Sequence, residues 1–200
     1  GADAVVAVSP YYFRVKPVEI VKHFAAICEH TKLPVIVYNV PVYTGNPIDA
    51  VTVNEIARFP GVVAFKDSSG NMPQFQKTIR LTRDLERFSV LQGVHVLSVI
   101  SLQMGAAGLV PGVANMIPRE MVQLYEAVRA GRLEEAYRIQ DQVVQLEEAF
   151  GMEGYSLSVL KGASQLLGFG GAQPHYPLPA LSEEGLGKLA AIMRSEGNGR

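Results

Sequence analysis

The sequence predicts an α/β protein built on a parallel sheet, and two observations support this prediction. Short runs rich in valine, without polar residues at alternate positions, recur along the first half of the chain. Such runs are typical of strands that are covered on both faces, and those strands are mostly parallel. Longer amphipathic stretches separate the runs, which is the alternation of repeated βα units. A doubly wound open sheet and a closed barrel both fit this alternation.

The predicted strands are apolar runs that end at a turn or at a polar residue. They are Ala4–Val8, Pro34–Tyr38, Val62–Phe65, Ser89–Leu91 and Ala106–Val110. No glycine-rich GxGxxG loop follows a strand, which weighs against dinucleotide binding. The chain opens directly at an apolar run. Since an eight-stranded barrel usually needs about 250 residues, a barrel would lack about three βα units before Gly1.

Helices are predicted between the strands and again after them. The first group is Pro17–His30, Thr52–Phe59, Met72–Arg83, Val96–Met104 and Pro118–Ala130. After Gly131 the strands stop, and a second group follows: Leu133–Phe150, Ser156–Leu167 and Ser182–Arg194. We therefore predict a sheet-containing part over residues 1–131 and a C-terminal helical extension over residues 132–200.

Composition narrows the class of protein. The chain has 200 residues, 48% hydrophobic and 18% charged, with a net charge of −1, so no basic field is available to attract nucleic acid or an anionic membrane. Its single cysteine, Cys28, cannot form an intrachain disulfide, and a reducing cytoplasm is the default location. No run is long enough to span a bilayer. The four histidines are scattered, so we expect no metal site.

Lys66 is the first candidate for chemistry. In parallel α/β folds, reactive groups gather at the carboxyl ends of the strands, and Lys66 directly follows the apolar run VVAF. Burial disfavours the charged form of a lysine. The neutral amine is a nucleophile that condenses with a ketone to form an iminium. The alternatives are a lysine that reaches out to solvent or one that pairs with Asp67.

Tyr38 is the second candidate, because it ends the preceding strand at the matching point. Neighbouring strands lie about 4.8 Å apart, so a phenol on one and an amine on the next can face the same edge of the sheet. A phenol in that position shuttles protons during iminium formation. The alternative is an aromatic packing residue whose hydroxyl has a backbone partner.

Three segments together resemble a known family. SPYY at 9–12, YNVPVYTG at 38–45 and VVAFKDSSGN at 62–71 resemble the dihydrodipicolinate synthase / N-acetylneuraminate lyase family of Schiff-base-forming class I aldolases, in order and spacing. The later stretch GAAGLVPGVANMIP resembles the last barrel strand of that family, and the similarity covers essentially the whole chain. The resemblance implies a (β/α)8 TIM barrel, of which residues 1–131 hold strands 4–8. It also implies neither metal nor organic cofactor, and a homotetramer built as a dimer of dimers.

The resemblance also implies roles for individual residues. Lys66 falls on the Schiff-base lysine, Tyr38 on the tyrosine that relays protons, and Tyr12 on a tyrosine that reaches across a dimer interface into the neighbouring site. The implied substrate-binding residues are Tyr43, Thr44 and Gly45 of the specificity loop, and Val110, whose backbone carbonyl faces the substrate.

Two departures from the family pattern bear on the substrate. Tyr43 stands where the synthase branch usually has an arginine, and a phenol supplies neither the charge nor the bidentate fork of a guanidinium. The segment Gln92–His95 replaces paired acids. We therefore predict an aldolase or lyase that uses pyruvate and an aldehyde. In the cleavage direction its substrate would be a deoxy sugar acid or a compound of the 4-hydroxy-2-oxoglutarate type. Arg14 is a candidate replacement for the missing charge.

Three alternatives remain open. The first is the 4-hydroxy-tetrahydrodipicolinate synthase reaction of lysine biosynthesis, the second a non-catalytic paralogue that binds a 2-oxo acid, and the third an unrelated barrel using a phosphate or a metal. The resemblance further implies that the glycine-rich segment and Thr-Thr pair that bind the pyruvate carboxylate lie upstream of residue 1. If nothing precedes Gly1, we expect no significant activity from this chain.

Overall fold

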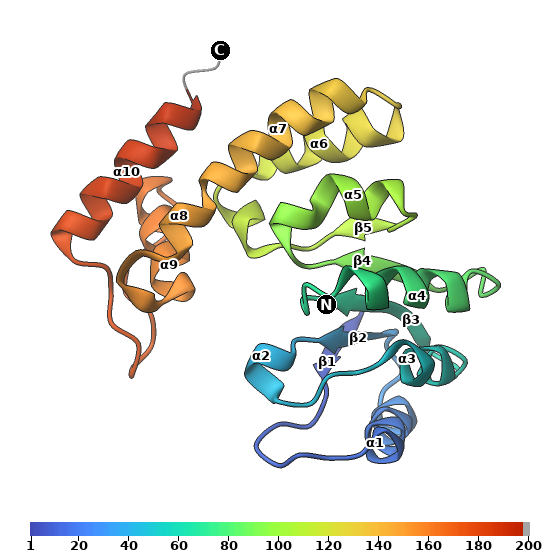
Figure 1. Ribbon diagram of the computed structural model, residues 1–200. Helices are drawn as coiled ribbons and strands as arrows, with labels where there is room; N and C mark the ends of the chain where they lie inside the picture. The colour runs from blue at the N-terminus through green and yellow to red at the C-terminus, as the bar shows by residue number, and fades with distance from the viewer. Residues whose placement is uncertain (198–200) are drawn as a thin grey trace. The chain divides into compact units, whose positions relative to one another are not determined.

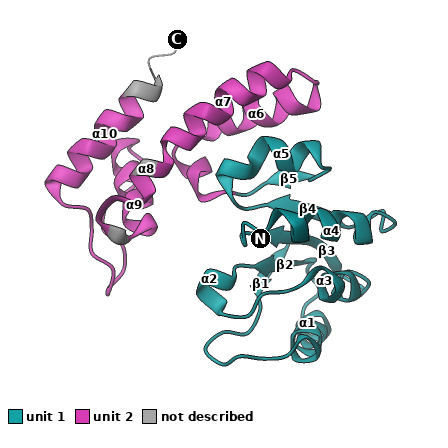
Figure 2. Ribbon diagram, in the orientation of Figure 1, with its two compact units in different colours: residues 1–110 teal, residues 111–200 magenta. Residues whose placement is uncertain are grey.

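The computed structural model describes residues 1–197, and their side chains except those of 148, 154 and 195–197. It consists of two compact units, Gly1–Val110 and Pro111–Arg200 (Figure 2). The first unit holds the sheet and the predicted site residues. The second is helical.

The first unit confirms the parallel sheet. Its strands pair only in parallel and lie in the order in which they occur in the chain, which Figure 1 shows as a succession from β1 to β5. They are β1 (Val5–Val8), β2 (Val35–Asn39), β3 (Val62–Asp67), β4 (Ser89–Gln92) and β5 (Gly108–Leu109). β3 extends through Lys66 to Asp67, whereas β5 is shorter than the predicted run Ala106–Val110.

Helices connect successive strands of this sheet. They are α1 (Pro17–His30), α2 (Pro41–Thr44), α3 (Ala50–Ile56), α4 (Met72–Thr82), η1 (His95–Leu97) and α5 (Ser98–Gln103). Crossovers between parallel strands are right-handed. When each strand is added on the same side of the one before it, as in the order β1 to β5, the connecting helices therefore all lie on one face of the sheet. A doubly wound sheet reverses its order at a switch point. The described strands do not, and this excludes the doubly wound alternative.

The two faces of the sheet are unequally buried. Val35, Val37, Phe65 and Val90 alternate along the strands and are buried, as expected for the face that the helices cover. On the other face, Ile36 and Leu91 are only half-buried, and Val6 is 57% exposed. The sequence predicted strands that are covered on both faces. In the structure, one face of the sheet is buried and the other is only partly covered.

Local sequence features explain two differences from the predicted helices. α3 begins earlier than predicted, because the Asp49 carboxylate accepts hydrogen bonds from the backbone N–H groups of Val51 and Thr52, which is the usual way of satisfying a helix N-terminus. α2 was not predicted. It begins at Pro41, a residue suited to a first turn, and ends at Thr44, where the following Gly45 has a left-handed φ of 71°.

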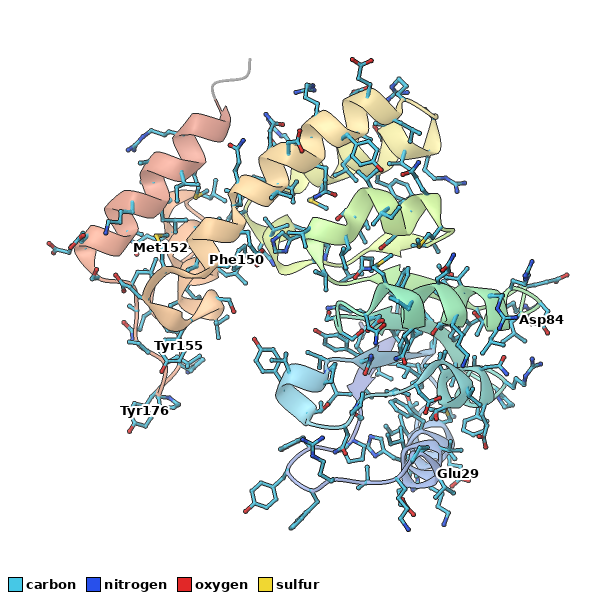
Figure 3. All side chains as sticks on the ribbon, viewed as in Figure 1. Glu29, Asp84, Phe150, Met152, Tyr155 and Tyr176 are labelled. Carbon is cyan, nitrogen blue, oxygen red and sulfur yellow. The ribbon has the colours of Figure 1, made fainter. Side chains whose placement is uncertain are left out.

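The second unit consists of helices. They are η2 (Gly112–Asn115), α6 (Pro118–Arg129), α7 (Leu133–Gln145), α8 (Glu147–Phe150), η3 (Met152–Gly154), α9 (Ser156–Leu166) and α10 (Glu183–Gly197). The predicted helix Leu133–Phe150 is thus divided into α7 and α8. A segment rich in glycine and proline runs between α9 and α10, and Tyr176, 96% exposed, projects from it (Figure 3).

The unit boundary differs from the predicted division at residues 131/132. α6 and α7 pack together, with Leu124 of α6 and Ile139 of α7 fully buried, so α6 belongs with the helices that follow it. The assignment of residues 1–131 to a partial barrel and 132–200 to an extension stays a prediction. Residues 198–200 of that extension lie outside the described part of the chain.

Candidate active site

β2 and β3 bring Tyr38 and Lys66 together. The two residues are register partners at the carboxyl ends of adjacent parallel strands. The Lys66 Nζ lies 4.1 Å from the centroid of the Tyr38 ring, within the range of a cation–π contact. Both side chains are half-buried. The amine therefore lies over the phenol ring and remains partly accessible. The structure confirms that the two residues lie together at the same edge of the sheet, whereas their roles stay predictions.

Asp67 does not compete for this amine, because consecutive residues of a strand point to opposite faces. Its carboxylate is buried and accepts hydrogen bonds from the Asn39 side-chain amide and from the Ser69 backbone N–H, both 2.9 Å long. Burial raises the pKa of Asp67, and the hydrogen bonds from Ser69 and Asn39 partly oppose that rise. Asn39 in turn accepts from the Ile48 backbone N–H at 3.0 Å. The alternative of a Lys66–Asp67 ion pair is therefore not supported.

Ser68 and Gly93 complete the surroundings of the amine. The Ser68 hydroxyl donates to the Tyr38 phenol oxygen at 3.3 Å, and the Gly93 N–H donates to the Asp67 carbonyl at 2.8 Å. A Cβ at position 93 would lie 2.0 Å from Ser68 Oγ and 3.1 Å from Lys66 Cε. The sequence alone assigned no role to either residue: Ser68 lies within the motif at 62–71 and Gly93 within the segment Gln92–His95. The available signal was a glycine at the end of the neighbouring strand, which often marks a close approach.

Tyr12 is not brought to Lys66 by the contacts of the described chain. It lies in the loop after β1 with a left-handed φ of 77° and is 87% exposed. Its ring packs edge-on against Phe13, with the centroids 4.8 Å apart. Tyr11 and Phe13 are also exposed, so the loop presents three adjacent aromatic residues to its surroundings.

The predicted specificity residues Tyr43, Thr44 and Gly45 lie in and after α2. Tyr43 is 76% exposed, whereas Thr44 is buried, and its hydroxyl lies within hydrogen-bond distance of the Ser9 hydroxyl, at 3.1 Å. The carbonyl of Gly45 accepts a hydrogen bond from the Arg14 guanidinium. The structure therefore joins this turn to the loop that follows β1.

Val110 directly follows β5, the last strand in the order of the sheet. Its backbone N–H donates to the Gln92 carbonyl at 2.8 Å, and its side chain is exposed. This bond extends the β4–β5 pairing by one residue.

Among residues 1–197, no three or more His, Cys, Asp and Glu side chains gather as a potential metal site, and no helix combines the length and apolar character needed to cross a membrane. Cys28 is half-buried, and burial raises the pKa of its thiol, which agrees with a structural thiol.

The fold and the site together define a parallel α/β protein with a lysine–tyrosine pair at the carboxyl edge of its sheet. The chain belongs to the dihydrodipicolinate synthetase family, whose sequence profile matches residues 1–196. This finding confirms the family that the three motifs indicated.

Similar proteins span more than this chain. The 4-hydroxy-tetrahydrodipicolinate synthase of Methanospirillum hungatei is 35% identical over 193 residues, which cover 96% of this chain and 65% of that protein. The protein of the same name from Methanoculleus marisnigri is 34% identical, with 98% and 67% covered. The solved dihydrodipicolinate synthase of Bacteroides thetaiotaomicron is 34% identical, with a TM-score of 0.90, and 98% of this chain covers 67% of it. The chain thus spans about two thirds of the length of these relatives.

Proposed function

We propose that this protein is a lyase of the class I aldolase type, in which Lys66 forms a Schiff base with pyruvate or another 2-oxo acid. The observation that carries the proposal is the position of the Lys66 Nζ, 4.1 Å from the centre of the Tyr38 ring at the carboxyl edge of a parallel sheet. Membership of the dihydrodipicolinate synthetase family supports it. The five described strands then correspond to strands 4–8 of an eight-stranded barrel.

In the proposed reaction, the neutral Lys66 amine attacks the ketone carbon of the 2-oxo acid. The resulting carbinolamine loses water to give an iminium, which withdraws electrons from the adjacent carbon. Loss of a proton from that carbon gives an enamine, which adds to the carbonyl of an aldehyde. Cleavage is the reverse of this addition, and hydrolysis of the iminium then releases product and restores the amine.

Tyr38 is the proposed proton relay for these steps. Its ring lies beside the amine, and its phenol oxygen accepts a hydrogen bond from Ser68. A phenol held in this way can give a proton to the departing water and take one back. Tyr12 is proposed as a second relay residue that acts in a neighbouring copy of the chain, and Tyr43, Thr44, Gly45 and Val110 are proposed to line the substrate site.

Separate observations favour two different reactions at this site. The specificity turn presents the exposed hydroxyl of Tyr43 and no guanidinium. This favours a reaction that forms or cleaves a deoxy sugar acid or a compound of the 4-hydroxy-2-oxoglutarate type. The names of the similar proteins favour the 4-hydroxy-tetrahydrodipicolinate synthase reaction instead. Turnover with pyruvate and a panel of aldehydes decides between them, and aspartate semialdehyde as the preferred acceptor would select the synthase.

The proposed partner is a second copy of the same chain, in a dimer of dimers located in the cytoplasm. The exposed aromatic residues Tyr11, Tyr12 and Phe13 support it, because adjacent exposed aromatic side chains are enriched at protein interfaces. One solved structure at 29% identity is described as a monomeric dihydrodipicolinate synthase variant. Sedimentation equilibrium therefore tests the assembly, and a monomer at all concentrations would contradict it.

The Schiff base is tested by trapping. The protein is incubated with pyruvate, reduced with borohydride and digested, and the peptide containing Lys66 should carry one reduced adduct. The Lys66→Ala variant should lose the adduct, whereas Lys32→Ala, which removes an exposed lysine, should keep it. Binding of pyruvate without a covalent product would instead support the non-catalytic paralogue, and an adduct that survives in Lys66→Ala would refute the assignment of the amine.

A further inference from the structure

One buried amide joins two segments at the carboxyl edge of the sheet. Asn46 is 3% exposed and directly follows the turn that contains Tyr43. Its side-chain N–H groups donate to the carbonyls of Pro10 and Phe13, each at 2.8 Å. Its side-chain oxygen accepts from the Val15 backbone N–H at 2.9 Å. A single side chain thus holds three backbone groups of the loop after β1.

Two further contacts join the same segments. The Ser9 hydroxyl donates to the Asn46 backbone carbonyl at 2.8 Å, and its oxygen lies within hydrogen-bond distance of the Thr44 hydroxyl, at 3.1 Å. The Arg14 guanidinium donates to the Gly45 carbonyl. Ser9 and Thr44 are buried. Because buried polar groups that lose their partners are costly, these contacts hold the loop 9–16 against residues 41–46.

The loop needs such support at Tyr12. A left-handed φ is uncommon for residues with a bulky side chain, and Tyr12 adopts a φ of 77°. The groups held by Asn46 lie on both sides of it, at Pro10 before and at Phe13 and Val15 after. An unfavourable backbone conformation persists only where its surroundings fix it. The Asn46 amide contacts the backbone on both sides of Tyr12.

We propose that Asn46 is a positioning residue that holds Tyr12 in its left-handed conformation and couples it to the turn of Tyr43. This inference rests on the proposed function, because Tyr12 is a relay residue only if the Schiff-base chemistry occurs. Lys66, Tyr38 and Ser68 form their contacts on β2 and β3 without Asn46. The consequence is that losing the Asn46 amide impairs the steps that need Tyr12 and leaves the amine able to condense with a ketone.

The first test is amide hydrogen exchange, which needs no substrate. In Asn46→Ala, protection of the Val15 amide should fall about tenfold or more, since one hydrogen bond and its geometry are lost. Asn46→Asp keeps an acceptor for Val15 but loses both donors, so it should release the loop as well. The matched control is Asn54→Ala, which removes an exposed side-chain contact with Arg58 and should leave the loop unchanged. Parent-like exchange over residues 10–15 in Asn46→Ala would overturn the proposal.

The second test separates positioning from general loss of structure. Deuterium exchange into the methyl group of pyruvate reports proton transfer through the enamine, and borohydride trapping reports adduct formation on Lys66. Asn46→Ala should slow methyl exchange about as much as Tyr12→Phe does, with the extent of trapping at saturating pyruvate unchanged. The double variant should be no slower than the slower single variant, because both changes act on one group.

The outcomes of the second test are distinct. Additive slowing in the double variant, or a parallel fall in trapping, would show that Asn46 acts apart from Tyr12 and would overturn the coupling. A parent protein that forms no adduct on Lys66 would instead refute the proposed function. In that case hydrogen exchange alone decides whether the Asn46 amide holds the loop.

Discussion

Replacement of Gly93 by alanine tests whether the end of β4 shapes the site around Lys66. The new Cβ would lie 2.0 Å from Ser68 Oγ, 3.0 Å from the Asp67 carbonyl oxygen and 3.1 Å from Lys66 Cε. The Ser68 hydroxyl can rotate away, but it then gives up its hydrogen bond to Tyr38. The Asp67 carbonyl belongs to the backbone and cannot rotate away, so β3 and β4 must separate slightly.

The expected loss follows from these contacts. A lost hydrogen bond costs about 0.5–1.5 kcal/mol, and overpacking of a close site costs about 1–3 kcal/mol. We therefore expect the free energy of unfolding to fall by about 2–4 kcal/mol, as measured by urea denaturation. Misplacement of the amine by about 1 Å should slow adduct formation with pyruvate on the order of 100-fold, as measured by the time course of borohydride trapping.

Two companion variants make the test specific. Gly108→Ala places a Cβ 3.4 Å from a Leu91 methyl group in the same sheet, an ordinary contact, and should change the unfolding free energy by less than about 1 kcal/mol. Adding Ser68→Ala to Gly93→Ala removes the shortest contact and should recover part of the stability. If Gly93→Ala unfolds and forms adduct as the parent does, the close approach inferred at this position is wrong.

Three other substitutions have defined outcomes. Tyr38→Phe should slow adduct formation on Lys66 by about 10²- to 10⁴-fold, because it removes the proposed proton relay; trapping time courses measure this. Burial raises the pKa of Asp67 in the folded protein. The free energy of unfolding should therefore decline as pH rises from the ordinary pKa of 3.8 through the raised pKa. Asp67→Asn should abolish this decline, as measured by urea denaturation at a series of pH values. Asp49→Ala should cost about 1 kcal/mol, because it removes the cap of α3. Burial favours a raised pKa for Asp49, but the hydrogen bonds from the start of α3 outweigh it and lower the pKa. The contribution of the cap is therefore present above 3.8 and should fade as pH falls through the lowered pKa.

Each of these outcomes can be contradicted. A parent-like trapping rate in Tyr38→Phe would remove the phenol from the chemistry. A pH profile of Asp67→Asn that matches the parent would assign the pH dependence to other groups. An Asp49→Ala protein with parent stability at neutral pH would mean that solvent replaces the cap at no cost.

The sequence was sufficient to predict the parallel sheet and the pairing of Tyr38 with Lys66. Valine-rich runs locate the strands because burial selects for them, and matching strand ends bring the two residues into register. The precise starts of the helices were less accessible. α3 starts at a cap that precedes its apolar pattern, and α2 is held by Pro41 and Gly45 over a single turn, which is too short to show periodicity.

The remaining site residues depend on contacts between segments that are distant in the chain. Gly93 matters because β4 places it against Ser68 and Lys66, and a glycine at a strand end does not by itself show which residues it approaches. Asn46 follows a turn and looks like an ordinary loop residue, yet it is buried and bonded to residues more than thirty positions earlier. Polar residues with such partners are found only once the segments that surround them are placed.

The buried hydrogen bond between Asn39 and Asp67 has a consequence for how this fold tolerates changes in chain length. Deleting one residue within β3 ahead of Lys66 would shift the end of the strand by one position, so that Asp67 takes the place of Lys66. The amine would then point toward the helices, because side chains alternate between the faces of a sheet. The amide–carboxylate bond opposes such a shift, since both groups would lose a buried partner. Insertions beyond Ser69 leave this bond in place. Loop length can therefore vary between related sequences while the amine keeps its direction.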